Sequence, residues 1–119
     1  MATILVAEDE APLLILAESY LGEQGHQTLS AGTLEQALAL IDGEHEIDVL
    51  FTDLGLGGDA QAGLELAKQA VERRPEVKVL YTTGQTLTDG MKELFVSGSA
   101  FVAKPYTVEQ LTTALSSVL

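Results

Sequence analysis

The sequence predicts an α/β fold in which one parallel sheet of five strands is covered by helices on both faces. Five short runs of strand length occur along the 119 residues, and each is followed by a segment whose apolar residues have helical spacing. Nearly continuous apolar runs are typical of parallel strands buried on both faces, and alternation with helices implies a doubly wound sheet with right-handed crossovers. No repeat, low-complexity stretch or linker interrupts this alternation, so we expect a single domain over residues 1–119.

The five predicted strands are short and regularly spaced. They are residues 3–7 (TILVA), 26–30, 48–52 (DVLFT), 77–82 (VKVLYT) and 100–103. Their apolar pattern does not reveal the order of the strands in the sheet. For a doubly wound sheet we expect the flavodoxin-like order 2-1-3-4-5, in which the first and third strands are neighbours.

The predicted helices are marked by proline, glycine and capping residues. Pro12 fits the first turn of the first helix, and Gly25 fits its end. Two Thr-x-x-Gln motifs, which begin at Thr33 and Thr107, match capping boxes and predict two further helix starts. The fourth helix is the weakest, because Gly90 interrupts it. The five helices are predicted over residues 12–21, 34–41, 64–74, 87–96 and 108–118.

The charge of the chain is strongly negative and unevenly distributed. There are 6 Lys and Arg residues against 18 Asp and Glu, which gives a formal net charge of −12. The first 67 residues hold 13 of the acids and no Lys or Arg, whereas the remaining 52 hold 6 bases and 5 acids. Binding to nucleic-acid phosphates needs clustered Lys and Arg, so we expect no direct nucleic-acid partner.

Cysteine content and hydropathy exclude cysteine-dependent sites and membrane-spanning segments. The absence of cysteine excludes disulfide scaffolds, thiolate metal sites and cysteine nucleophiles. No apolar run approaches the ~18 residues that a membrane span needs. The first residues also lack the basic region of a signal peptide. We therefore expect a cytoplasmic protein that does not contact a membrane.

Polar residues collect where four of the predicted strands end. They are Glu8, Asp9 and Glu10 after the first strand, Asp53 after the third, Thr82, Thr83 and Gly84 after the fourth, and Lys104 and Pro105 after the fifth. Ligands of doubly wound sheets bind beyond the carboxyl ends of the strands. Carboxylates from the first and third strands would converge there and repel one another unless a cation lay among them. Oxygen ligands without His or Cys favour a hard ion, so we expect Mg²⁺.

A cation of this kind suggests phosphoryl chemistry. Mg²⁺ bound by a few carboxylates usually keeps waters and a phosphate oxygen among its ligands. An aspartate can itself accept a phosphoryl group, and Asp53 is central among the polar residues. Lys104 and Thr83 would then offer a positive charge and a hydroxyl donor to the phosphoryl oxygens.

Four segments together resemble the receiver domain of bacterial response regulators in two-component signalling. They are ILVAEDE, DVLFTD, VLYTTG and GSAFVAKPY, in this order, each at the end of a predicted strand. The resemblance extends from residue 3 to residue 118. It is to a single-domain, chemotaxis-regulator-like receiver, and the Thr-Thr-Gly sequence is similar to that of a subset with an unusual fourth helix.

The resemblance implies a role for each matching residue. Asp53 is the implied phosphoacceptor, with Thr83 bonding the phosphoryl group and Lys104 pairing with it. The implied Mg²⁺ ligands are Glu8 through water, Asp9, Asp53 and the backbone carbonyl of Gly55. Phe101 occupies the position of the switch aromatic, which in this family moves inward together with the threonine. Gln85 is our own hypothesis for a residue that affects how fast water reaches the acyl phosphate.

The sequence departs from the family pattern after the acceptor. Many members read Asp-x-x-Met-Pro and reach a glycine about eight residues after the aspartate. Here the residues between Asp53 and Gly63 include no proline, and Gly63 lies ten residues after Asp53. We expect this longer loop to be more mobile, which bears directly on the metal geometry at Gly55.

Each of these residues also has a plainer interpretation. An acidic run such as residues 8–10 is often a solvated turn, and Asp53 could close an Asx-turn. One of Thr82 and Thr83 faces the core or caps a turn, and only the resemblance selects Thr83. Phe101 fits an ordinary packed strand residue, and neither histidine of the chain has a neighbour that suggests a role.

The predicted function is that of a phosphoacceptor receiver in two-component or phosphorelay signalling. A histidine kinase or histidine phosphotransfer protein would donate the phosphoryl group, and a downstream protein would bind the face made by the fourth helix, fifth strand and fifth helix. We expect no turnover beyond self-catalysed acceptance and hydrolysis, and no output domain within these residues.

Three alternatives remain open. A degenerate receiver would bind partners without phosphorylation. An aspartyl-phosphate phosphatase would normally carry a second aspartate two residues after the nucleophile, where this chain has Gly55. A flavodoxin-like cofactor binder would normally place aromatic residues around the flavin and a hydroxyl-rich loop after the first strand.

Overall fold

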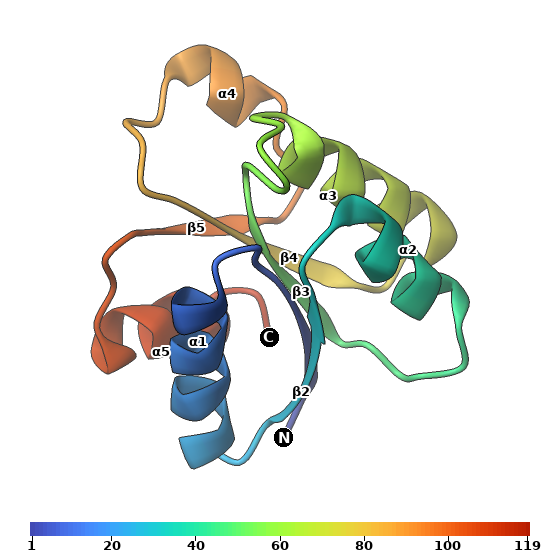
Figure 1. Ribbon diagram of the computed structural model, residues 1–119, viewed down its shortest axis with the longest axis vertical. Coiled ribbons are helices and arrows are strands. Elements are labelled where there is room, and N and C mark those ends of the chain that lie inside the picture. The colour runs from blue at the N-terminus through green and yellow to red at the C-terminus, as the bar shows by residue number, and fades with distance from the viewer.

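The computed structural model describes residues 1–119 and contains one sheet of five parallel strands in the order β2-β1-β3-β4-β5 (Figure 1). The strands are β1 (Thr3–Ala7), β2 (Gln27–Ala31), β3 (Val49–Asp53), β4 (Lys78–Thr83) and β5 (Ala100–Ala103). The predicted fold class and strand order are therefore confirmed. Three strands begin and end one residue later than predicted. Pairing explains the later ends of β3 and β4, because Asp53 is still paired with Thr82 and Thr83 with Ala103.

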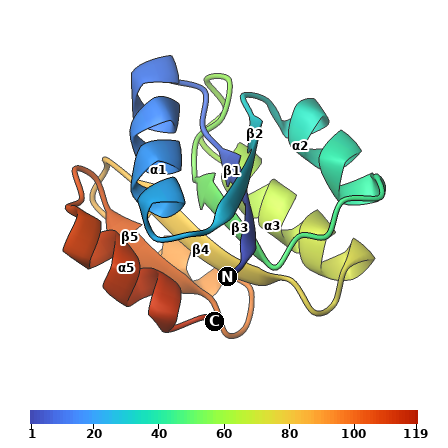
Figure 2. The same cartoon turned by 90° about the horizontal axis from the view of Figure 1, so that it is seen from below.

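The helices cover both faces of the sheet. They are α1 (Ala11–Glu23), α2 (Leu34–Asp42), α3 (Ala62–Arg73), α4 (Asp89–Glu93) and α5 (Val108–Ser116). Figure 2 shows α1 and α5 on one side of the sheet and α2 and α3 on the other. None of these helices combines the length and apolar character that crossing a membrane would require.

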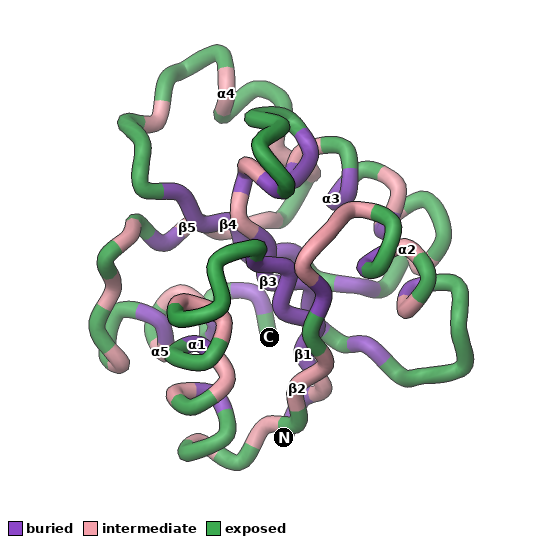
Figure 3. Tube along the Cα trace, viewed as in Figure 1, coloured by how far each residue is buried: buried purple, intermediate pink, exposed green.

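Two hydrophobic cores result from this layering, one on each face of the sheet. Successive strand residues point to opposite faces, so Leu50 joins the core under α2 and α3, whereas Val49 and Phe51 join the core under α1 and α5. The three central strands, β1, β3 and β4, are accordingly buried along most of their length, whereas the edge strands β2 and β5 are more exposed (Figure 3). Burial on both faces holds the strand ends, and hence the residues that follow them, in fixed positions.

Both predicted Thr-x-x-Gln caps form, although one differs from the ideal box. The hydroxyl of Thr107 accepts from the backbone of Gln110, whose side chain accepts in return from the backbone of Thr107. At α2 the hydroxyl of Thr33 accepts from Gln36 N, but the Gln36 side chain accepts from Gly32 N, one residue further back. Each cap satisfies backbone donors that the first helical turn leaves unpaired.

The fourth helix is shorter than predicted, since α4 spans only Asp89–Glu93 rather than residues 87–96. The hydroxyl of Thr88 accepts from Met91 N and fixes its start. At its end, the Val96 amide donates to the phenol oxygen of Tyr81 at 3.0 Å instead of to a helical carbonyl. No residue of α4 is buried, and Figure 3 shows this part of the chain mostly exposed. The segment is thus held by the bond to Tyr81 and by Met91, Phe95 and Val96, which are only partly buried against the core under α2 and α3.

Candidate functional site

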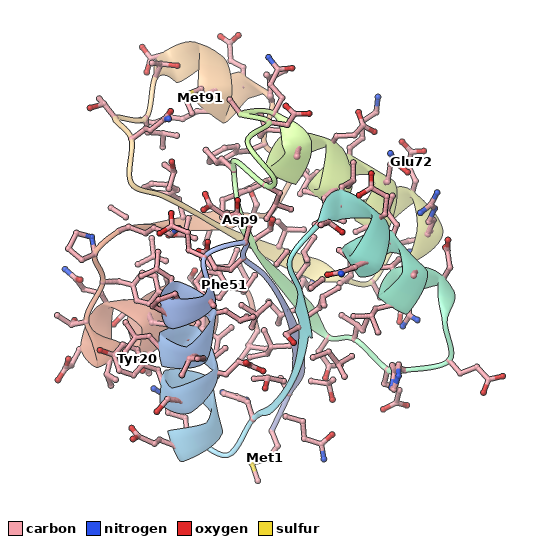
Figure 4. All side chains as sticks on the ribbon, viewed as in Figure 1. Met1, Asp9, Tyr20, Phe51, Glu72 and Met91 are labelled. Atoms are coloured by element: carbon pink, nitrogen blue, oxygen red, sulfur yellow. The ribbon has the colours of Figure 1, made fainter.

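The polar residues predicted to meet do so in an open pocket at the carboxyl ends of the strands. The pocket has a volume of about 350 Å³. Six of the eight predicted site residues line it, namely Asp9, Asp53, Gly55, Thr83, Gln85 and Lys104. Figure 4 shows Asp9 just beyond β1 and Met91, another lining residue, on α4. The other two predicted residues, Glu8 and Phe101, lie outside the lining.

Lys104 joins the acidic residues of two strands. Its ammonium nitrogen Nζ lies 2.6 Å from Asp53 Oδ2 and 2.6 Å from Glu8 Oε1. The side chains of Lys104 and Asp53 are 12% exposed, and that of Glu8 only 5%. Hydrogen bonds between ionised partners are short and strong, and a pair this buried loses little to screening. The predicted acceptor therefore lies in direct contact with the predicted lysine.

Burial and pairing act on the ionisation of these groups in opposite directions. Burial raises the pKa of the Glu8 carboxyl above its usual value, although the hydrogen bond from Lys104 opposes this. Burial alone would lower the pKa of Lys104, but its bonds to Asp53 and Glu8 outweigh that effect and raise the pKa. The ammonium therefore stays charged and offsets part of the negative charge around it.

Asp9 is exposed, but the loop after β3 holds its carboxylate in place. The amide of Gly57 donates to Asp9 Oδ2 at 3.0 Å, and the amide of Gly55 donates to Asp53 Oδ1 at 3.2 Å. One carboxylate oxygen from each of Glu8, Asp9 and Glu10 lies within 4.8 Å of the others. The chemistry of these donors fits Mg²⁺, which prefers carboxylate and carbonyl oxygens to nitrogen or sulfur. The ligand role of the Gly55 carbonyl stays a prediction.

The longer loop after Asp53 forms a tight turn. Leu56 and Asp59 exchange backbone hydrogen bonds of 3.2 and 3.0 Å. Gly57 and Gly58 between them have φ values of +60° and +82°, as a primed turn requires of its two central residues. The expected mobility of the loop stays a prediction, but the turn explains how the extra residues are accommodated outside the sheet.

Thr83 and Thr82 have different surroundings. The sequence left open which of the two lies at the site and which faces the core. Thr83 lines the pocket, and its hydroxyl accepts from Gln85 N at 3.2 Å. Thr82 is not part of the lining and is buried in the sheet. The structure therefore places Thr83, as the resemblance implied, beside Asp53 and Lys104.

Phe101 belongs to a row of aromatic rings behind the pocket. It is paired with Tyr81 on the neighbouring strand, and Phe95 stacks on Tyr81 with the ring centroids 4.1 Å apart. The centroids of Phe95 and Phe101 are 6.4 Å apart. Phe101 is half-buried, which agrees with the plainer interpretation of a packed strand residue and leaves its switch role a prediction.

Sequence reasoning did not single out Asp59, Met91 or Tyr106, and it gave no separate role to Glu10. Glu10, Asp59 and Met91 line the pocket, and the ring of Tyr106 packs against that of Phe51. Burial raises the pKa of Tyr106 to about 12, against the opposing field of Lys104. Tyr106 could have been found, because it follows the Lys-Pro pair directly. Nothing in the pattern of the sequence indicated Met91, since its position depends on the short α4.

The pocket does not favour the flavin or phosphatase alternatives. No aromatic side chain lines it, so nothing would stack on a flavin ring. Gly55 contributes no carboxylate at the position where the phosphatases carry their general acid. The surroundings of Asp53 are instead suited to a metal-assisted reaction of its own carboxylate.

Comparison of the sequence with known protein families assigns the chain to one of them. Residues 4–116 match the family described as response regulator receiver domain. The two-component response regulator PhoP of Pseudomonas aeruginosa is 32% identical over 117 residues, which cover 98% of this chain and 51% of that protein. The transcriptional regulatory protein AruR of the same organism is 29% identical over 98% of this chain and 48% of its own length. The chain thus spans about half the length of these relatives.

Solved structures show the same similarity. A response regulator receiver protein from Sinorhizobium medicae superposes with a TM-score of 0.88 at 30% identity, covering 98% of this chain and 93% of the other. The response regulator TrrA of Thermotoga maritima, solved in complex with Mg²⁺ and BeF, has a TM-score of 0.83 at 24% identity over the whole of both chains. The second likeness concerns the fold alone.

Proposed function

Because this chain belongs to the response regulator receiver domains of two-component systems, we propose that it accepts a phosphoryl group on Asp53. The observation that carries the proposal is the contact of Asp53 with Lys104 inside the polar pocket. An isolated aspartate at a strand end would have no reason to be paired with a buried ammonium. In a receiver, this arrangement presents a carboxylate nucleophile beside a group that stabilises the charge of a phosphoryl oxygen.

The proposed step is an in-line displacement at phosphorus. A carboxylate oxygen of Asp53 forms a bond to the phosphorus of a phosphohistidine, the P–N bond breaks, and the leaving imidazole keeps the electron pair and takes up a proton. Lys104 supplies positive charge and Thr83 a hydroxyl donor to the phosphoryl oxygens. We expect no turnover of other substrates, only this acceptance and later hydrolysis. Gln85, which lines the pocket next to Thr83, remains our candidate for tuning hydrolysis.

Glu8, Asp9, Asp53 and the Gly55 carbonyl are the residues that would hold Mg²⁺. These residues suit Mg²⁺ because they offer only oxygen donors and because an acidic cluster lies at the end of β1. A bound Mg²⁺ would neutralise part of the charge that develops on the phosphoryl group. Asp9 lines the pocket, and the Gly57 amide engages only one of its two carboxylate oxygens.

The proposed signal is a change at the face made by α4, β5 and α5. Phosphorylation of Asp53 to an acyl phosphate replaces one carboxylate by a group of about two negative charges, which draws Lys104 and Thr83 toward it. Phe101 lies on β5 between this site and that face, and it also lines a shallow groove with Pro105, Gln110 and Ala114. Leu94, which directly follows α4, is 60% exposed although it is apolar. These features support the binding of a downstream protein there.

A histidine kinase or histidine phosphotransfer protein is the proposed phosphodonor. Glu10 lines the pocket and immediately precedes α1, so a donor that reaches Asp53 passes beside this helix. On α1, Ile15 is 65% exposed and Leu16 37% exposed. An exposed apolar pair on the helix that follows Glu10 supports docking of a protein rather than of a small molecule alone. Donors of this kind place the reaction in the cytoplasm, and the acidic surface gives no support for direct nucleic-acid binding.

The phosphoryl mimic beryllofluoride tests the proposal without a kinase. In ¹⁵N-labelled protein with Mg²⁺, we expect beryllofluoride to shift the backbone amide signals of Gly55, Thr83 and Lys104. The Asp53→Asn variant is the control, and it should keep its fold and show no such shift. If the parent protein shows no shift either, a degenerate receiver that binds partners without phosphorylation becomes the better description.

A further inference from the structure

The hydroxyl of Thr82 is the one buried side-chain polar atom in the structure without a hydrogen-bond partner. The residue is 3% exposed, so its hydroxyl is removed from bulk solvent. Leaving a buried hydroxyl unpaired lowers stability, whereas an apolar group of the same shape would carry no such penalty. A threonine at this position therefore needs an explanation that the resting structure does not supply.

The register of the sheet places Thr82 in one row with the charged residues. Thr82 is paired with Asp53 of β3 on one side and with Val102 of β5 on the other. Directly paired residues of parallel strands point to the same face, and Val102 belongs to the core under α1 and α5. Because successive residues of a strand point to opposite faces, the side chain of Thr83 points to the other face of the sheet from that of Thr82.

The side chain of Lys104 has to pass the position of Thr82. Lys104 follows β5, and its Nζ bonds Asp53 at the end of β3 and Glu8 beyond β1. Because β4 lies between β5 and β3, a side chain that joins these residues crosses the end of β4. The backbone amide of Lys104 donates to Thr83 O at 3.0 Å, which fixes the start of this path on β4.

We propose that Thr82 is a positioning residue whose hydroxyl accepts a hydrogen bond from the Lys104 ammonium when the site binds a divalent cation. In the resting structure Glu8 and Asp53 hold the ammonium, which has three N–H donors. Once the same carboxylates face a divalent cation, repulsion between the two positive charges weakens the hold on Lys104. The ammonium then withdraws along its own side chain toward β4, where the Thr82 hydroxyl is the buried acceptor. The inference rests on the proposed function, because the cation site is part of it.

Three variants with MgCl₂ as the only ligand test this. Thr82→Val keeps the shape but removes the hydroxyl, and Thr82→Ser keeps the hydroxyl. Thr28→Val removes a threonine hydroxyl on β2, away from the pocket, and serves as the matched control. The thermal unfolding midpoint is measured against Mg²⁺ concentration at constant ionic strength, which yields an apparent Kd for each protein.

Without Mg²⁺, we expect Thr82→Val to be at least as stable as the parent. Its apparent Kd for Mg²⁺ should rise about tenfold, as expected for the loss of a hydrogen bond to a charged group. The Kd of Thr82→Ser and of Thr28→Val should stay close to that of the parent. Rescue by serine separates the hydroxyl from simple packing.

Each contrary result overturns the inference. An unchanged Kd for Thr82→Val shows that Lys104 does not use the hydroxyl. A loss of stability without Mg²⁺ shows that the hydroxyl already has a partner at rest. An equally weakened Thr82→Ser assigns the effect to shape. If the parent itself gains no stability from Mg²⁺, the metal part of the proposed function fails together with the inference, whereas failure of the variants alone leaves the proposed function intact.

Discussion

Gly63 shows how a single residue can hold the acceptor in place without touching a ligand. A Cβ atom at this position would lie 1.9 Å from the carbonyl oxygen of Asp53, and the Gly63 amide donates to Leu54 O at 2.8 Å. The first turn of α3 thus packs directly against the backbone at the end of β3. Only glycine permits this approach, whatever the length of the loop between the two residues.

We predict that Gly63→Ala destabilises the protein by about 2–3 kcal/mol, the cost typical of overpacking against backbone. Gly22→Ala in α1 is the matched control, because a Cβ there meets nothing within 4 Å. Alanine is the better helix former, so this change should stabilise by roughly 0.5–1 kcal/mol. Urea denaturation of the three proteins measures both effects. Similar unfolding free energies for the two variants would show that Gly63 is not in close contact with β3.

At the residue scale, the sequence predicted the chemistry of the site better than its geometry. Asp53 and Lys104 were identified from their positions at strand ends, because parallel strands end at one edge of the sheet. Thr83 was selected over Thr82 only by the resemblance to the family. The bond of Lys104 to Glu8 as well as Asp53 was not foreseen. It depends on the reach of a long side chain across β4, and strand-end positions alone do not specify side-chain paths.

Among the secondary-structure elements, α4 and the residues after it are held differently from the other helices. Tyr81 on β4 accepts the Val96 amide with its phenol oxygen and stacks on Phe95 with its ring. This contact adds to the packing of Met91, Phe95 and Val96, which are only partly buried against the core under α2 and α3. The predicted helix over residues 87–96 was too long because apolar spacing does not reveal that a side-chain oxygen takes over a backbone donor.

We expect Tyr81→Phe to loosen this segment while leaving the rest of the fold intact. The variant keeps the ring but leaves the Val96 amide without its acceptor, which costs about 1 kcal/mol. Hydrogen exchange should become faster at Val96 and its neighbours. Tyr20→Phe in α1 is the control, since its phenol oxygen makes no hydrogen bond to another residue that could be lost. Unchanged exchange at Val96 would mean that the segment is held by packing alone.

At the scale of the whole molecule, the fold places a strongly acidic chain around a site for which we propose the acceptance of a further anion. The formal net charge is −12, and no Lys or Arg precedes residue 68. Such a field attracts cations to the pocket and favours partners with basic surfaces. The architecture itself was predictable, because alternating apolar periods, short connections and the handedness of crossovers leave few arrangements for five strands.

We predict that this charge limits stability at low salt. Raising sodium chloride to about 1 M, where the Debye length falls to about 3 Å, should raise the thermal unfolding midpoint by several degrees. Potassium chloride should act in the same way, since the effect is screening and not specific binding. A midpoint that does not respond to either salt would show that repulsion among the acidic residues is already offset within the fold.

The central claim, phosphorylation of Asp53, is tested most directly by intact-mass spectrometry after incubation with a small acyl-phosphate donor. The parent protein and Asp53→Asn are each treated with and without Mg²⁺. We predict a gain of one phosphoryl mass that requires Mg²⁺ and is absent from the variant. A parent protein that gains no mass under any condition, or a variant that gains the same mass, would contradict the assignment of Asp53 as the acceptor.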